Sequence, residues 1–168
     1  MKCRVFKFVL LLVAVLVSRE SLAEPQSSIL ASVKQMVAEY GTLKGVNCVE
    51  LHKGHGLGLV KAILRPKLGK EFLDGVNSII IIEHTKASNE ICHSLWCRLE
   101  GYAATHREFR FDNNEFGGGE RVRGYVAIDE TTMIASELVM SVDDKGAKLL
   151  IYMGGVLDAK KMDLAPKQ

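Results

Sequence analysis

Four consecutive isoleucines, at positions 79 to 82, constrain the fold of this chain more than any other feature of its sequence. They lie within residues 77–84, and β-branched side chains favour strands over helices. Successive side chains of a strand point to opposite faces of its sheet, so an unbroken apolar run indicates a strand buried on both faces. We expect this segment to be a central strand.

One helix is predicted before this strand and one after it. Ser27 or Ser28 begins the first, whose apolar side chains recur at helical spacing up to Tyr40. Gly41 follows, at a position where a left-handed residue commonly ends a helix. Ser88 begins the second helix. Its apolar stripe is made by Ile91, Leu95, Leu99 and Tyr102.

Most of the remaining segments have the pattern of strands. Residues 45–51 predict a strand that is at least half buried, with Cys48 pointing inward. The later segments alternate apolar and polar residues and are joined by short turns, which indicates an antiparallel meander. These segments are residues 106–113, 121–129, 133–142 and 147–153.

The end of the chain contains two glycines and a second apolar stretch. Gly154 and Gly155 are expected to break the last strand, and residues 157–164 to form a short terminal helix. Helices thus come early and strands late. The sequence therefore predicts an α+β fold, an antiparallel or mixed sheet with the helices packed on one face and a late β-meander.

A glycine-rich segment, residues 52–58, separates a predicted strand from a stretch of helical composition that ends at Pro66. Strand, glycine loop and helix is the order found in nucleotide-binding loops. The dinucleotide fingerprint needs a glycine where Leu59 or Lys61 stands, and the Gly-Lys-Ser/Thr of a P-loop is missing. We therefore interpret the segment as a flexible connector and expect no cofactor.

The first 23 residues predict a secretory signal peptide. Cationic residues precede an unbroken apolar run, residues 8–17, and small residues precede the expected cleavage between Ala23 and Glu24. The apolar run is shorter than the roughly 20 residues that span a bilayer. We expect an exported protein, periplasmic or extracellular, with a single domain over residues 24–168 and no membrane span after signal cleavage.

Removal of the signal peptide changes the charge of the chain. The whole sequence carries a formal charge of +2, but residues 24–168 keep 18 basic and 19 acidic residues, a charge of −1. Nucleic-acid binding requires a concentrated basic surface, and neither this charge nor its distribution along the sequence provides one. We therefore expect no nucleic-acid partner, and the expected partner is a protein or another component of the cell envelope.

A signal peptide and a short helix precede four segments that carry a family resemblance. These segments are residues 45–49, 73–79, 134–140 and 149–155, from Gly-Val-Asn-Cys-Val to Leu-Leu-Ile-Tyr-Met-Gly-Gly. In order and spacing they resemble a bacterial family described as domain of unknown function 4252. The resemblance implies a small exported protein of Gram-negative bacteria with an α+β fold. It implies no activity and no catalytic residues.

Three cysteines follow the predicted cleavage site, and export favours their oxidation. Cys48 on a buried strand and Cys92 on the core edge of the second helix can approach each other if that helix packs on the sheet. We therefore predict a disulfide between Cys48 and Cys92. A bridge from Cys92 to Cys97 is the weaker alternative, because residues five apart on a helix point ~140° away from each other.

Cys97 falls opposite the apolar stripe of its helix and is expected to face solvent. It precedes Arg98 and follows His93 by one helical turn, so it is the candidate for an activated thiol. The interpretation that we favour is an exposed or oxidised cysteine. Apart from His93, the cation of Arg98 is the only feature that supports an activated thiol.

Histidines supply the remaining candidate ligands. His52 and His55 lie beside glycines and, with His93 or a cysteine, would form a zinc site, which needs three or four nitrogen or sulfur ligands. Two loop histidines do not complete that set, so we expect no metal, and we interpret His84 and His106 as structural. The motifs Gly-x-Ser-x-Gly and Ser-x-x-Lys are missing, so we predict no catalytic residues.

The sequence thus predicts an exported binding or accessory module of unknown ligand. Its contact surface is expected on the open sheet face or on the glycine-rich loops at residues 54–58 and 117–119. The alternative function is a small metal-binding protein or enzyme that uses His52, His55 and a cysteine.

Overall fold

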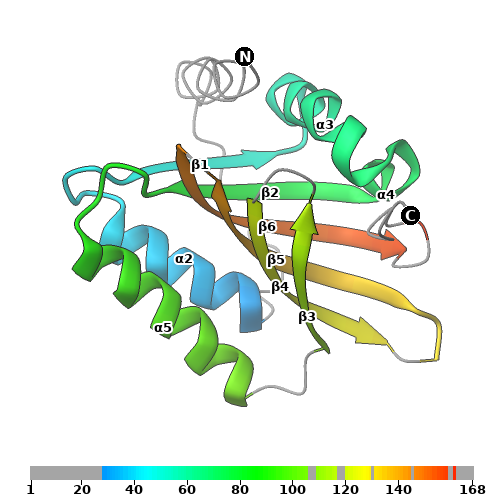
Figure 1. Cartoon of the computed structure of the whole chain (residues 1–168). Coiled ribbons are helices and arrows are strands. Elements are labelled where there is room, and N and C mark those ends of the chain that lie inside the picture. Colours follow the sequence, from blue (N-terminus) through cyan, green and yellow to red (C-terminus); the bar gives the residue numbers. More distant parts are fainter. Residues whose placement is uncertain are drawn as a thin grey trace.

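The computed structural model describes residues 28–105, 109–116, 120–129, 131–144, 146–158 and 161. The predicted signal peptide, His106 and residues 117–119 therefore lie outside the described residues. In chain order the elements are α2 (Ser28–Tyr40), β1 (Asn47–His52), α3 (His55–Leu68), α4 (Lys70–Asp74), β2 (Val76–Glu83), α5 (Asn89–Thr105), β3 (Phe109–Phe116), β4 (Glu120–Asp129), β5 (Ile134–Asp144) and β6 (Ala147–Asp158) (Figure 1).

The strands form one six-stranded sheet in the order β1-β2-β6-β5-β4-β3. Each neighbouring pair is antiparallel. The run from β3 to β6 is the predicted meander, so the α+β class and the antiparallel sheet are confirmed. Strand β2 lies between β1 and β6, and its four isoleucines are buried. The long apolar run thus forms an inner strand, next to the edge strand β1.

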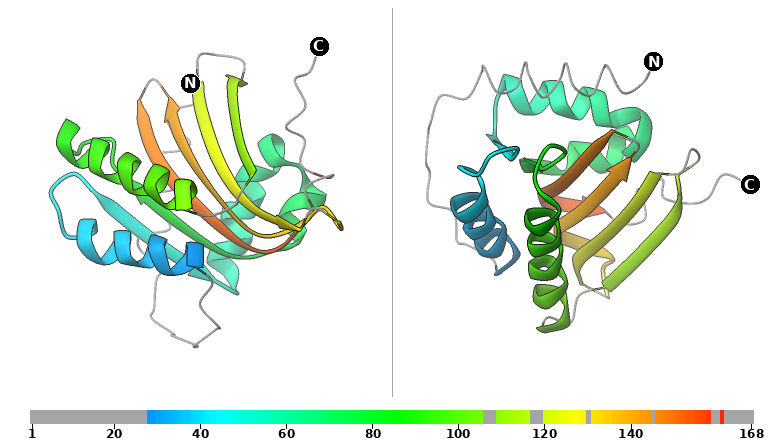
Figure 2. Two further views of the ribbon diagram at one scale, coloured as in Figure 1. Left: turned by 90° about the horizontal axis from the view of Figure 1, so that it is seen from below. Right: turned by 60° about the vertical axis from the view of Figure 1, so that its left-hand side comes forward.

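The placement of the helices on one face was wrong, because helices cover both faces of the sheet (Figure 2). Ile79 and Ile81 pack in one apolar cluster with α3 and α4. Ile80 and Ile82 pack in a second cluster with α2 and α5. A strand with large apolar side chains on both faces exposes one set to water unless each face has its own layer. The helix pairs supply these two layers.

The glycine-rich segment does not form a flexible connector, since α3 begins inside it at His55 and continues past Pro66. The apolar stripe of α3 explains this difference. Its side chains are buried at spacings of three and four residues, which favours a helix packed on the sheet over the low helix propensity of glycine. Pro66 lies only two residues before the end of the helix. The buried stripe is Leu57, Val60, Leu64 and Leu68.

The double glycine does not end the last strand, because β6 continues through it to Asp158. The register with β5 shifts beside Gly154, which marks a β-bulge. Gly155 has a φ of 149°, and a Cβ there would overlap the carbonyl oxygen of Gly75. Glycine therefore allows two backbone segments to approach closely. The predicted helix at residues 157–164 is wrong at its start, where Leu157 is a buried strand residue.

The two helices predicted around the isoleucine strand are confirmed as α2 and α5. The apolar stripe of α5 faces the sheet, with Leu95 and Leu99 buried. The end of α2 differs in one detail, since Gly41 has no positive φ and the left-handed residue is Gly45, with a φ of 87°. No helix in the described part of the chain is long and apolar enough to cross a membrane.

Candidate functional site

His52 and His55, the predicted metal-ligand candidates, lie at the end of β1 and the start of α3. The exposed ring of His52 has its Nε2 atom 3.8 Å from the Glu50 carboxylate. Within the ranges that the structure describes, no group of three or more His, Cys, Asp or Glu side chains could hold a metal ion. Among the described residues, His52 and a cysteine therefore do not belong to a complete metal site.

The structure instead places a histidine beside Cys92. Ser88 caps α5, since its Oγ accepts a hydrogen bond of 3.3 Å from the Ile91 amide. The short connection from β2 to α5 returns the first turn of the helix to the end of the strand. As a result, Nδ1 of His84 lies 3.3 Å from Sγ of Cys92, and the Cys92 thiol also lies 3.6 Å from the His84 carbonyl oxygen.

The His84 ring is buried, and its environment favours the neutral form. Burial lowers the pKa of His84, the charge of Lys148 lowers it further, and Asp143 and Glu83 act in the opposite direction. When the ring proton is on Nε2, Nδ1 accepts a hydrogen bond from the Cys92 thiol. The sequence analysis treated His84 as a lone structural histidine. One signal could have revealed this pair: only eight residues separate His84 from Cys92, across a tight turn from strand to helix.

A second thiol and imidazole pair lies on the solvent side of the same helix. Sγ of Cys97 is 3.4 Å from Nε2 of His93 and 3.9 Å from Nδ1. Cys97 is exposed, as predicted. Arg98 is directed toward α2, where it forms an ion pair with Glu39 and lies 6.0 Å from the centre of the Tyr40 ring. The imidazole of His93, and not the guanidinium, is therefore the close neighbour of Cys97.

Cys48 differs from the other two cysteines in its surroundings. It is half buried on β1, and burial together with the negative charge of Glu50 raises the pKa of its thiol to about 11. Cys48, Cys92 and Cys97 are all free thiols in the structure. The bridge predicted between Cys48 and Cys92 is therefore not formed here, and it stays a prediction.

A buried carboxylate, which the sequence analysis did not single out, lies on the same face of the sheet as α2 and α5. The Tyr152 hydroxyl donates a hydrogen bond of 2.8 Å to Oε1 of Glu137, and both side chains are buried. Ser78 is close by, since a Cβ on Gly154 would contact both its Oγ and the Tyr152 hydroxyl. The three residues are far apart in sequence. Only the sheet register brings them together.

The far end of the sheet presents three exposed apolar side chains. Val156 is 65% exposed, Ile134 41% and Met133 38%. Ile134 pairs with Asp158 across β5 and β6, so it lies diagonally opposite Val156. Their neighbours in the two strands, Ala135 and Leu157, are buried on the α3 and α4 side. We call Met133, Ile134 and Val156 the apolar end of the sheet.

The turn before this apolar end is held by several hydrogen bonds. The Asp129 carboxylate accepts bonds from the amides of Thr131 and Thr132, at 2.8 and 3.2 Å, and these bonds lower the pKa of Asp129. The Met133 amide donates to the Asp129 carbonyl oxygen at 2.8 Å. Met133 itself has a φ of 61°, which is unfavourable for a residue with a side chain. The turn therefore keeps an apolar side chain in a strained, exposed position.

Comparisons with protein-family models, with curated proteins and with solved structures found no match for this chain.

Proposed function

We propose that this chain is an exported binding or accessory module, periplasmic or extracellular after cleavage between Ala23 and Glu24. The cationic start, the apolar run and the small residues before the cleavage site support export. The resemblance to domain of unknown function 4252 points to the same compartment. The proposed partner is a protein of the cell envelope.

The apolar end of the sheet is the observation that carries this proposal. Single exposed apolar residues are common on protein surfaces, but adjacent ones often mark an interaction site. Here Val156 and Ile134 are neighbours across two strands, and the bonded turn at Asp129 fixes Met133 beside Ile134. Because the turn and the strands already hold these side chains in place, their ordering adds little to the entropic cost of binding.

Site-directed photocrosslinking in intact cells tests the proposal. A photoreactive phenylalanine analogue replaces Val156 or Ile134 in separate variants, and Leu59 is the matched control, because its exposure of 37% is comparable to that of Ile134 but it lies on α3. We expect a discrete protein adduct at positions 156 and 134 and none at position 59. No adduct at any position, or the same adducts at all three, would contradict the proposed contact surface.

Export is tested separately on the same cells. We expect the protein in the periplasmic or extracellular fraction, with an intact mass that begins at Glu24. A protein that retains Met1 in those fractions, or one found only in the cytoplasm, would contradict the proposed signal peptide.

A further inference from the structure

The segment that contains α3 is strongly basic. Residues 51–70 carry five basic side chains and no acidic one, whereas the rest of residues 24–168 carries 13 basic and 19 acidic ones, a charge of −6. The basic residues of the segment are Lys53, Lys61, Arg65, Lys67 and Lys70. The sequence analysis found no basic surface of the extent that nucleic acids require and did not single out this shorter segment. A local excess of positive charge thus surrounds one helix.

The side of α3 that faces away from the sheet is apolar, although the outer side of a surface helix is normally polar. It carries Leu59, Ala62 and Pro66, which recur at helical spacing and are exposed, Leu59 to 37%. Gly58 lies beside them, and a Cβ there would meet no atom within 4 Å. No described element covers this side of the helix (Figures 1 and 2). The helix therefore presents apolar groups to the solvent as well as to the core.

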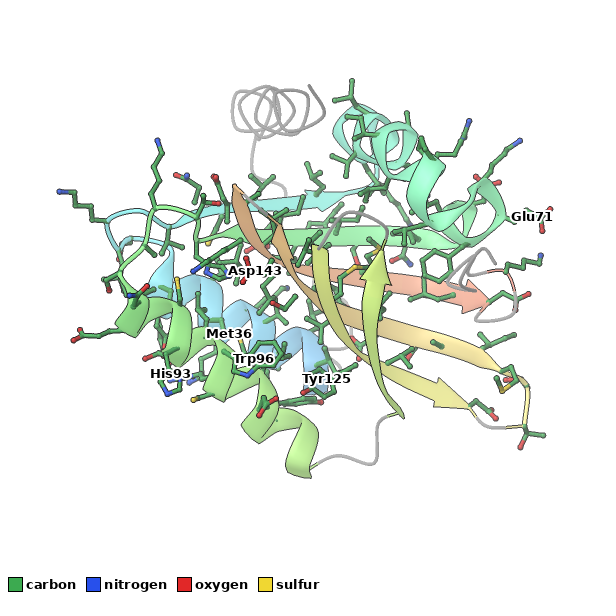
Figure 3. The ribbon with its side chains drawn as sticks, viewed as in Figure 1. Met36, Glu71, His93, Trp96, Tyr125 and Asp143 are labelled. Carbon is green, nitrogen blue, oxygen red and sulfur yellow. The ribbon has the colours of Figure 1, made fainter. Side chains whose placement is uncertain are left out.

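Two cations border this apolar side. Lys61 and Arg65 are one turn apart, so they lie on one flank of α3. Within the described part of the chain, no carboxylate forms an ion pair with either of them. Glu71, the first acidic residue after the segment, lies on α4 and pairs with Lys161 at 3.7 Å (Figure 3). Lys61 and Arg65 are therefore available to negative charges outside the chain.

An apolar ridge bordered by lysine and arginine is typical of a helix that lies flat on a membrane. The apolar side chains enter the boundary between headgroups and acyl chains, and the cations reach the lipid phosphates. We propose that the outer side of α3 binds the surface of a bilayer that contains anionic phospholipids. This inference goes beyond the proposed function and does not depend on the apolar end of the sheet, which lies on other elements.

Electrostatic attraction supplies most of this binding. Among the described residues of α3, Leu59 is the only large apolar side chain that is exposed, so burial in the bilayer adds a small contribution. Each lysine or arginine near an anionic membrane adds a further attraction, which salt screens. The association is therefore reversible and sensitive to salt. In this orientation α2 and α5, on the other face of the sheet, are directed away from the bilayer (Figure 2).

Co-sedimentation of the exported protein with lipid vesicles tests the proposal. Vesicles of phosphatidylcholine with about one third phosphatidylglycerol are compared with vesicles of phosphatidylcholine alone. We expect binding to the anionic vesicles and little to the neutral ones. Sodium chloride at about 0.5 M is expected to release the protein, because it screens exposed charges beyond about 5 Å.

A pair of charge variants assigns the binding to α3. Lys61→Glu combined with Arg65→Glu is expected to lower the partition coefficient on anionic vesicles at least about tenfold. Lys44→Glu combined with Lys86→Glu is the matched control, since it changes the net charge equally at exposed positions away from α3. We expect this control to lower the partition coefficient less than about twofold, through the net charge alone.

A pair of apolar variants tests the contact with the acyl chains. Leu59→Glu is expected to lower the partition coefficient about fivefold. Leu43→Glu is its control, because Leu43 has a similar exposure of 39% but lies between α2 and β1. This control is expected to lower binding less than about twofold. All variants have the same N-terminus, so the apolar run at residues 8–17 cannot cause a difference between them.

Several outcomes would overturn the proposal. Absence of vesicle binding, equal binding to neutral and anionic vesicles, or the same loss in a control as in its α3 variant would each do so. Retention on heparin without binding to anionic vesicles would identify a soluble polyanion as the ligand instead. Circular dichroism of each variant separates loss of the membrane contact from loss of folding.

Discussion

The two faces of the sheet differ in what they bury. On the face covered by α3 and α4, the packed side chains among the described residues are aliphatic or methionine apart from one aromatic ring, that of Phe72. The face covered by α2 and α5 contains buried tyrosines, the half-buried Cys48 and Trp96. The described residues that are polar and buried, Ser78, His84 and Glu137, all lie on this second side. The face covered by α3 and α4 stabilises the fold through apolar packing. The face covered by α2 and α5 does so too, and it also contains the buried ionisable side chains His84 and Glu137.

Substitution of Phe72 by alanine is expected to give the largest effect. The ring is 2% exposed, so its removal leaves a cavity in the apolar face, and we expect a loss of about 3–5 kcal/mol in the free energy of unfolding. Urea denaturation measures this value. A loss below about 1 kcal/mol would show that the α3 and α4 face contributes less than its burial indicates.

On the other face, Tyr152→Phe removes a hydroxyl but little volume. Oε1 of Glu137 then loses a buried donor, and we expect a loss of about 1–3 kcal/mol in the free energy of unfolding. Glu137→Gln is the matched variant, since its amide oxygen still accepts the bond from Tyr152, and a smaller loss is expected. If both substitutions were without effect in denaturation experiments, the polar group on this face would add nothing to stability.

Among the thiols on the side of the sheet covered by α2 and α5, a more deeply buried thiol is expected to react more slowly. With a pKa of about 11, only about one Cys48 thiol in a thousand is ionised at pH 8. We expect alkylation of Cys48 to be at least about tenfold slower than that of the exposed Cys97. Mass spectrometry of peptides at timed intervals measures both rates in one sample. Equal rates would show that Cys48 is not shielded in the folded protein.

A smaller effect is expected from the titration of His84. Burial lowers its pKa below the ordinary value of 6.5, so the unfolded chain binds this proton at a higher pH than the folded one. The free energy of unfolding should therefore decrease as the pH falls from 6.5 through the folded pKa. His84→Gln should flatten this part of the pH profile, whereas the same change at the exposed His52 should not. An unchanged profile in His84→Gln would contradict the assignment.

The isoleucine run contained more information about the fold than the sequence analysis used. It predicted a strand buried on both faces, and that property already requires a layer on each face, but the helices were assigned to one. The errors at residues 52–58 and at Gly155 have another cause. In both places local glycine preferences were outweighed by tertiary packing, the buried stripe of α3 and the close approach of Gly75 to β6.

The candidate sites were predictable only where the contact is local. His93 and Cys97 are one helical turn apart, so the sequence placed them side by side. The contact of His84 with Cys92 depends on how tightly the chain turns between β2 and α5. Glu137 and Tyr152 meet through the register of β5 and β6, and Ile134 meets Val156 in the same way. No periodicity within a single strand specifies such a pairing.

The position of β6 in the sheet has a consequence for the time course of folding. This strand comes after the other five in the chain, yet it lies between β2 and β5. The antiparallel pair of β1 and β2 and the meander of β3 to β5 precede β6 in the chain, and in the sheet they are joined only when residues 147–158 pair with both β2 and β5. Closure of the sheet requires contacts between segments distant in sequence, which form slowly. The sheet therefore cannot close until β6 is in place. Until then the edges of β2 and β5 are exposed.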